Sequence, residues 1–378
     1  MILINSLGIQ NSGGITVLDK LLDETKNSSY NYIIICYKNN NIENLIKKFD
    51  NCKNFKFKVF VSKGFLHRLY YENVILREVI KKERISLIYN FSGSAQFFLK
   101  IPQITKVHNL LFYSKKIDSL YFEKKEYLSW LKQIFVKRLV FHILIKQSKY
   151  IEVQSSHVKE NISDFINISY KSFFIKSDID IKKSDFKSPK EYNFKNKVKF
   201  LFIVGPHFKY LHKNFKDFVD CMKLLNNKEI DFEIVITLSK EELYSSDIWD
   251  KSLDNKTNFL GYISKDELKN QFQDNTILIS TSIIETLGLH VIESIQNGIL
   301  TIVPNESYST SVYGNEIFTY GLFNMKSLFN TIDKIISLNN NEIKDIIIKN
   351  QKYLIENENK KYKNIVDLFN EILKDNNV

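Results

Sequence analysis

The sequence predicts an α/β fold in which two Rossmann-like domains, each built on a parallel sheet, face one another. The chain has 378 residues, which is more than a single hydrophobic core usually serves. Short apolar runs alternate with longer helical patterns, as they do in βαβ units. One polar, lysine-rich stretch without periodicity, residues 176–197, interrupts this alternation. We therefore expect a linker there and a cleft between the two domains.

The first series of elements predicts an N-terminal domain over residues 1–185. Its apolar runs are short and bounded by polar residues, as buried strands are. The predicted strands are residues 2–4, 32–36, 57–61, 87–89, 103–107 and 150–153. Apolar residues at helical spacing predict helices between them, at residues 16–22 and 72–82.

The second series predicts a C-terminal domain over residues 195–378. Its expected strands are residues 200–204, 232–237, 257–260, 276–280 and 300–303, and its expected helices are residues 215–225, 265–271 and 287–297. Beyond the last strand the chain turns mostly helical, because residues 343–355 and 362–373 carry apolar side chains at a spacing of three to four. We assign these terminal helices to the C-terminal domain.

The net charge of +11 would ordinarily indicate nucleic acid or an anionic membrane as a partner. Lys, Asn and Ile are abundant, whereas Gly (11) and Pro (4) are scarce, the profile expected of an AT-rich coding sequence. Part of the basic excess therefore reflects codon usage. The sequence also carries no RRM, zinc or helix-turn-helix signature. We expect no nucleic-acid partner.

The cysteines and the apolar runs indicate a cytoplasmic protein. Cys36, Cys52 and Cys221 are odd in number and widely spaced, which supports neither a disulfide framework nor a zinc site. The apolar start of the chain is too brief for a signal peptide, and no run approaches the length of about 18 residues that a spanning helix needs. Any contact with a membrane is expected from the surface.

Residues 124–146 combine lysines and an arginine with aromatic and aliphatic side chains. This pattern suits a helix resting on anionic lipid. It suits equally a core helix with a lysine-rich exposed face, and both interpretations stay open.

The segment most informative about chemistry is residues 280–298. A strand ends at Ser280, a loop carries Glu285, and Gly288 lets the backbone approach a ligand where a helix begins. A helix N-terminus presents unpaired N–H groups and the positive end of the dipole, which suits a diphosphate. Glu293 lies about two turns into this helix, where its two oxygens could accept both hydroxyls of a ribose.

Two glutamates separated by seven residues on a strand–loop–helix, followed by Asn297-Gly298 and then Pro304, resemble the E-x7-E signature of retaining GT-B glycosyltransferases, particularly the family 4 group (glycosyl transferases group 1). The resemblance implies that Glu285 lies near the transferred sugar and that Glu293 holds the nucleotide ribose. It also assigns the loop between them to donor binding: Thr286, Leu287, Gly288 and Leu289.

A second segment resembles the family's glycine and Lys-Asn motif, with Gly205 ending a strand and Lys213-Asn214 preceding a helix. The resemblance implies that Lys213 contacts the donor diphosphate, where a cation offsets the charge that builds on the leaving group. The family often has an arginine a few residues earlier. Here His207 and Lys209 are the candidates for that second phosphate contact.

Two matches fall in the first half of the chain. Ser12-Gly13-Gly14 resembles the glycine pair through which the family's backbone approaches the donor phosphate or the acceptor, and His108 resembles a histidine that faces the reacting sugar across the cleft. Residues 153–159 resemble the strand end that closes the N-terminal half. The resemblance thus covers most of the chain in the family's order, and it implies an acceptor-binding N-terminal domain and a nucleotide-sugar-binding C-terminal one.

The predicted function is retaining transfer of a sugar from a UDP-, GDP- or ADP-sugar to a glycan or lipid-linked acceptor, in bacterial surface polysaccharide (O-antigen or capsule) or lipopolysaccharide biosynthesis. No metal is expected to be required, because Lys213 and two helix N-termini supply positive charge. Alternatives stay open: a non-catalytic GT-B scaffold that binds sugar nucleotide or membrane, and a GT-B phosphorylase or epimerase. Each named residue also has an ordinary structural interpretation, such as a solvated helix-end charge.

Overall fold

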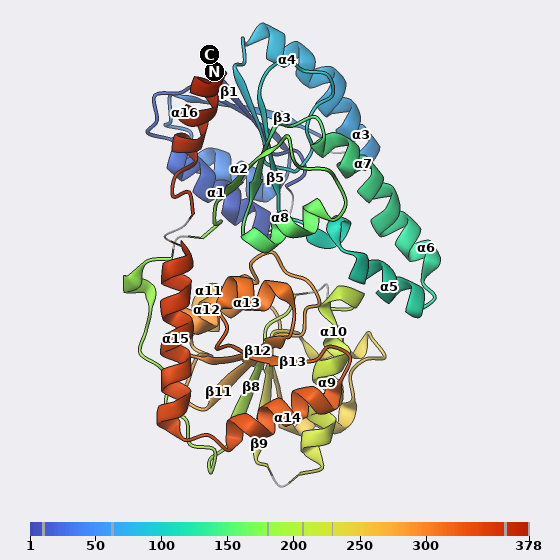
Figure 1. Cartoon of the computed structure of the whole chain (residues 1–378), viewed down its shortest axis with the longest axis vertical. Coiled ribbons are helices and arrows are strands. Elements are labelled where there is room, and N and C mark those ends of the chain that lie inside the picture. The colour runs from blue at the N-terminus through green and yellow to red at the C-terminus, as the bar shows by residue number, and fades with distance from the viewer. Residues whose placement is uncertain are drawn as a thin grey trace. The chain divides into compact units, whose positions relative to one another are not determined.

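The computed structural model describes residues 1–9, 12–61, 64–179, 181–205, 208–228, 230–358 and 361–376. The chain forms two compact units (Figure 1). The first contains Met1–Asp180 together with Lys361–Val378, and the second contains Ile181–Lys360. Each unit has its own parallel sheet, which confirms the prediction of two Rossmann-like domains.

The first unit holds a seven-stranded parallel sheet in the order β3-β2-β1-β4-β5-β6-β7. Its strands are β1 (Ile2–Asn5), β2 (Tyr32–Tyr37), β3 (Phe55–Phe60), β4 (Leu87–Asn90), β5 (Gln103–Val107), β6 (Tyr150–Val153) and β7 (Ser172–Ile175). Its α-helices are α1 (Ser12–Thr25), α2 (Asn40–Lys48), α3 (Phe65–Tyr70), α4 (Leu76–Lys82), α5 (Lys115–Glu123), α6 (Tyr127–Trp130), α7 (Val136–Ile145), α8 (Ser156–Ser163) and α16 (Ile365–Asp375).

Helices cover both faces of this sheet, so its strands β1 and β2 are almost entirely apolar. Alternate residues of β1 point to opposite faces. Ile2 and Ile4 pack with α1, α2 and α16, whereas Leu3 packs with α4. Figure 1 shows α1, α2 and α16 on one side of the sheet and α4 on the other. Two turns of π-helix, at Tyr71–Ile75 and Leu131–Phe135, join α3 to α4 and α6 to α7.

The C-terminal residues belong to the first unit, which corrects their assignment to the C-terminal domain. The amphipathic helix α16 buries Ile365, Leu368, Phe369 and Ile372 completely in the core of the first unit. The backbone N–H of Tyr362 also donates to the carbonyl of Ile175 at the end of β7. Apolar spacing reveals that a helix has a face to bury, but it does not say against which sheet.

The second unit holds a six-stranded parallel sheet in the order β10-β9-β8-β11-β12-β13. Its strands are β8 (Val198–Phe202), β9 (Phe232–Ile236), β10 (Thr257–Phe259), β11 (Thr276–Ile279), β12 (Leu300–Pro304) and β13 (Phe318–Tyr320). Its α-helices are α9 (Phe215–Asn226), α10 (Lys240–Tyr244), α11 (Lys265–Lys269), α12 (Leu289–Gln296), α13 (Ser307–Tyr313), α14 (Met325–Ile336) and α15 (Asn340–Glu358).

The boundary between the units falls inside the predicted linker, and the rest of that segment packs on the second unit. The N–H of Lys190 donates to the carbonyl of Gly298, at 3.0 Å. Gly298 has φ +74, and a Cβ on it would stand 2.3 Å from the carbonyl oxygen of Ser188. Tyr192 is buried, and its hydroxyl donates to the carbonyl of Thr276 at 2.8 Å. The glycine after α12 is therefore needed for packing.

No helix in the part of the chain that the structure describes combines the length and the apolarity needed to cross a bilayer.

Candidate active site

A pocket with a volume of about 490 Å³ lies in the second unit at the carboxyl ends of β8 and β11. These two strands are neighbours in the sheet, while β9 lies on the far side of β8 and β12 on the far side of β11. Such a reversal of strand order leaves a crevice in which ligands of α/β proteins bind. The chain leaves β8 through Gly205 and leaves β11 through Ser280 and Ser282, and all three residues line the pocket. Its volume suits a small organic ligand.

Lys213 and Glu285 form an ion pair at this pocket. The Lys213 Nζ lies 2.7 Å from Glu285 Oε1 and 3.4 Å from Ser282 Oγ. Lys213 ends a turn of 3-10 helix, and Asn214 with φ +46 then directs the chain into α9. The Thr281 hydroxyl donates to the carbonyl of Lys213 at 2.8 Å. The loop after β8 is thus tied to the loop after β11, which holds the ammonium and the carboxylate together.

The ion pair sets the protonation state of Glu285, whose side chain is 17% exposed. Burial raises the pKa of this carboxyl, but the charges of Lys213 and His290 and the hydrogen bonds from Lys213 and Ser282 outweigh it and lower the pKa to about 2. Glu285 is therefore an anion at neutral pH and a weak proton acceptor.

Gly288 begins α12 in a conformation that favours glycine. It has φ +58, and a Cβ on it would stand 2.0 Å from the hydroxyl oxygen of Tyr313. That hydroxyl donates to the carbonyl of Leu287, at 3.0 Å. The first backbone N–H groups of a helix have no acceptor within it and carry the positive end of the dipole. Leu289, the first residue of α12, is 38% exposed, so this end of the helix is accessible to an anion.

Glu293, on the same helix, is half-buried, and its carboxylate makes no hydrogen bond or ion pair within the described ranges. Desolvation raises its pKa, while the charges of Lys265 and Lys269 on α11 partly offset that rise. Leu268, also on α11, lines the pocket. Glu293 itself is not among the residues that line the pocket, whereas His290 of the same helix is. As a partly desolvated carboxylate near the lysines of α11, it can accept hydrogen bonds from two hydroxyl groups.

Residues 184–352, nearly the whole of the second unit, match the family described as glycosyl transferases group 1. The second unit is a group 1 glycosyltransferase domain. The chain is accordingly a glycosyltransferase, and the resemblance read from the two glutamates is confirmed at the level of the family.

Solved structures share the fold of the entire chain. HepE from Anabaena, in complex with UDP and glucose, superposes with a TM-score of 0.62 at 13% identity, over 99% of this chain and 98% of that one. A glycosyltransferase from Rickettsia africae gives 0.63 at 17% identity, over 99% and 98%. The lipopolysaccharide outer core galactosyltransferase WaaB, in its apo form, gives 0.62 at 15% identity, over 93% and 96%. These similarities show the GT-B fold. No curated protein matches by sequence.

The structure describes three further residues that were predicted to bind the donor in the group 1 domain. Gly205 is exposed, with open space where a Cβ would stand, so its backbone can approach a ligand. Thr286 is half-buried and Leu287 is buried. His207 lies outside the described residues. The roles of these residues stay predictions.

The predicted residues of the first unit lie apart from the group 1 domain in the sequence. Gly13 and Gly14 fall in the first turn of α1, and a Cβ on Gly14 would stand 3.0 Å from Ile9 Cγ2, so packing explains this glycine as well as ligand approach does. His108 follows β5 and is exposed at a second pocket. Desolvation and the neighbouring Lys106 charge lower the pKa of His108, which favours a neutral imidazole at pH 7.

Sequence reasoning gave little weight to several side chains that shape the group 1 domain's pocket. His290 Nε2 lies 2.9 Å from Ser280 Oγ, and desolvation lowers the pKa of this histidine to about 4. Tyr308 donates its hydroxyl proton to the carbonyl of Ser282, at 2.5 Å. A serine at the end of a predicted strand, such as Ser280, is common and does not by itself indicate a ligand site. The tyrosines of α13 are far from the motif in sequence, and only the fold brings them to it.

Proposed function

We propose that this glycosyltransferase moves a sugar from a nucleoside-diphosphate sugar to a glycan or lipid-linked acceptor, with the donor bound in the pocket of the second unit. The observation that carries the proposal is the 2.7 Å ion pair between Lys213, on the loop after β8, and Glu285, on the loop that leads into α12. The same helix carries Glu293, whose carboxylate makes no hydrogen bond or ion pair within the described ranges. In this arrangement the diphosphate lies against Lys213 and the start of α12, and the ribose hydroxyls donate to Glu293.

We propose that Lys213 acts on the leaving group and that the configuration of the transferred sugar is retained. As the bond between sugar and diphosphate breaks, negative charge builds on the departing phosphate, and a fixed ammonium stabilises that charge. The low pKa of Glu285, about 2, makes it a weak base, which leaves the departing phosphate to take the acceptor's proton. Because Lys213 and the helix end supply positive charge, activity should persist in EDTA.

The proposal also includes the biosynthetic process to which the acceptor belongs. One structural neighbour is a lipopolysaccharide outer core galactosyltransferase. We therefore place the chain in the biosynthesis of a bacterial surface polysaccharide such as O-antigen or capsule, acting on the cytoplasmic side.

Changing Glu293 to Ala is expected to weaken nucleotide binding by about 10–100-fold, because two hydrogen bonds to a charged acceptor are lost. UDP, GDP and ADP and their sugars would be screened by thermal shift, which reports ligands that bind only the folded state. Nucleotide release with acceptor and the anomeric proton coupling of the product would follow. The matched control is Glu356→Ala, since Glu356 is exposed on α15. If no nucleotide raises the melting temperature, or if both variants bind equally well, the donor site is misplaced.

We also propose that the face formed by α6 and α7 rests on an anionic membrane. The continuous helix over residues 127–145 leaves six apolar side chains exposed: Tyr127, Leu128, Leu131, Val136, Leu139 and Ile143. Lys124, Lys125 and Lys132 are exposed beside them. A core helix would bury its apolar face, so this combination favours the interpretation as a lipid-facing helix.

Full-length protein should therefore sediment with vesicles that contain phosphatidylglycerol and much less with vesicles of phosphatidylcholine alone. Leu128 is 75% exposed, and Leu128→Asp should abolish most of this binding. Ile348, 51% exposed on α15 in the second unit, gives the control Ile348→Asp. Equal sedimentation of the two variants would exclude this face as the lipid contact.

A further inference from the structure

The first unit has a pocket in the position that corresponds to the donor pocket of the second. It lies where β1 and β4 are neighbours and the strand order reverses. Its volume is about 250 Å³, and its lining includes Gly8 after β1, Gly93 after β4 and His108 after β5. Among its lining residues are three basic side chains, Arg68, Lys106 and Lys137, and no Asp or Glu from the described part of the chain.

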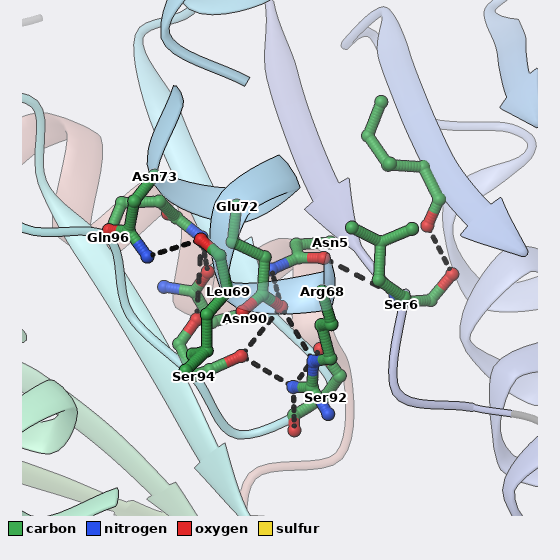
Figure 2. A network of polar contacts seen from close by, with 12 residues as sticks. Asn5, Ser6, Arg68, Leu69, Glu72, Asn73, Asn90, Ser92, Ser94 and Gln96 are labelled. Carbon is green, nitrogen blue, oxygen red and sulfur yellow. Dashed lines mark hydrogen bonds and ion pairs between the residues drawn. The ribbon is translucent and has the colours of Figure 1, made fainter. Parts of the chain in front are cut away.

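Arg68 is held rigidly at this pocket (Figure 2). Its Nε donates to Glu72 Oε1 at 3.0 Å, and its Nη2 donates to the carbonyl of Ser92 at 2.9 Å and to Ser94 Oγ at 2.5 Å. Glu72 is completely buried, and the same Oε1 accepts from Asn5 Nδ2 at 2.9 Å. These bonds fix the plane of the guanidinium before any ligand arrives, as binding sites require.

The remaining nitrogen of Arg68 is available to a ligand. Nη1 makes no hydrogen bond within the described ranges. It lies against Gly8, where a Cβ would stand 2.4 Å from it. The Arg68 side chain is only 12% exposed. A glycine at position 8 is thus what leaves room for the edge of the guanidinium beside the pocket.

The other two basic groups differ in their partners. The positive charge of Lys106 is balanced by two carboxylates, because its Nζ lies 2.7 Å from Glu152 Oε1 and 2.5 Å from Asp178 Oδ1. Lys137, on α7, is exposed and forms no ion pair among the residues described. Of the three basic side chains, Arg68 through Nη1 and Lys137 through Nζ therefore keep a donor nitrogen for a ligand within the described part of the chain. A fixed guanidinium edge with a nearby ammonium is the arrangement that recognises phosphate and carboxylate groups.

We propose that this pocket binds an oxyanion carried by the acceptor, so that the acceptor is a phosphorylated or carboxylated glycan or a lipid-linked phosphate. Phe112 and Phe141, stacked with ring centroids 4.9 Å apart, supply an apolar wall against which the ring of a sugar can pack. The inference rests on the proposed function, since it names the chemical class of the acceptor for that same transfer.

The test uses the full chain in a Lys213→Ala background, so that phosphate bound at the donor pocket does not contribute. Calorimetric titrations with inorganic phosphate, glucose 6-phosphate, glucuronate and glucose separate free phosphate, phosphorylated sugar, carboxylated sugar and neutral sugar. Lys137→Glu should weaken binding of the anions by at least about tenfold. Lys81→Glu, the same charge change at an exposed lysine of α4 that does not line the pocket, should leave it unchanged.

The outcomes separate this inference from the proposed function. Nucleotide binding to the protein with Lys213 intact tests the donor site alone and should not respond to Lys137→Glu. The proposal of an oxyanion site is overturned if no anion binds, if glucose binds as well as glucose 6-phosphate and glucuronate do, or if Lys81→Glu and Lys137→Glu weaken binding equally. If the protein with Lys213 intact binds no nucleotide while the anions still bind at the pocket of the first unit, the proposed function is overturned instead.

Discussion

Lys213→Ala is expected to lower the rate of sugar transfer by about 10²–10³-fold, the cost of removing one group that stabilises charge in a transition state. The ammonium lies 2.7 Å from Glu285 at the pocket in which we place the diphosphate. The expected loss falls mainly on turnover, because the charge that Lys213 offsets is largest when the bond to the leaving group breaks. The kcat and KM of the variant, measured with the donor identified by the screen, check this.

The matched control is Lys216→Ala, because Lys216 is exposed on the neighbouring helix α9 and, among the residues that the structure describes, pairs with Asp220 alone, at 2.7 Å. It should retain the parental rate. A Lys213→Ala variant with parental kcat, or an equal loss in both variants, would contradict the role of Lys213.

The same substitution changes how stability depends on pH. The pKa of Glu285 is about 2 in the folded chain and 4.5 ordinarily, so its ion pair stabilises the fold above pH 4.5 and loses that effect as the pH falls to about 2. Without Lys213, burial acts on the carboxyl with less opposition, and its pKa rises. The two proteins should therefore differ most in melting temperature at neutral pH and least near pH 2.

Lys106→Met is expected to lower the free energy of unfolding by about 3–5 kcal/mol, because it leaves two buried carboxylates without their cation. The Lys106 side chain is 3% exposed, that of Glu152 1% and that of Asp178 5%. Tyr89 donates to the second oxygen of Glu152 at 2.6 Å, and this bond alone does not balance the charge. Burial acts to raise the pKa of Asp178, but the Lys106 charge and hydrogen bond lower it overall. The shift in denaturant midpoint measures the loss.

A compensated variant is the control for this prediction. Combining Lys106→Met with Glu152→Gln and Asp178→Asn removes both charges, and it should recover part of the lost stability. A single variant that unfolds within about 1 kcal/mol of the parent would show that the cluster is hydrated and not the buried ion network described.

The sheets were largely predictable from the sequence, except for one edge strand of each sheet. Strands inside a parallel sheet are covered on both faces, so most of their residues are apolar. The strands β5 and β6 match their predicted bounds although each also buries a charged residue, Lys106 and Glu152. The outer strands β7 and β13 were missed. They are short and only partly buried, because an edge strand has a neighbour on one side only.

The sequence predicted those residues of the candidate site that belong to recognisable family motifs, and it did not predict the residues that pack around them. Resemblance assigned Lys213 and Glu285 to one site, and the structure places them in contact. The reason that Gly288 must be glycine was not predictable, because Tyr313 approaches it from a different helix. Likewise Arg68 and Glu72 have the spacing of a helical ion pair, but nothing in the sequence shows that Gly8 lies against the free guanidinium edge.

The most direct test of the donor site is a crystal structure of the protein with the nucleoside diphosphate that gives the largest thermal shift. The diphosphate oxygens should lie within hydrogen-bonding distance of Lys213 Nζ and of the first N–H groups of α12, with both ribose hydroxyls on the carboxylate of Glu293. A nucleotide bound elsewhere, in contact with none of these groups, would contradict the account.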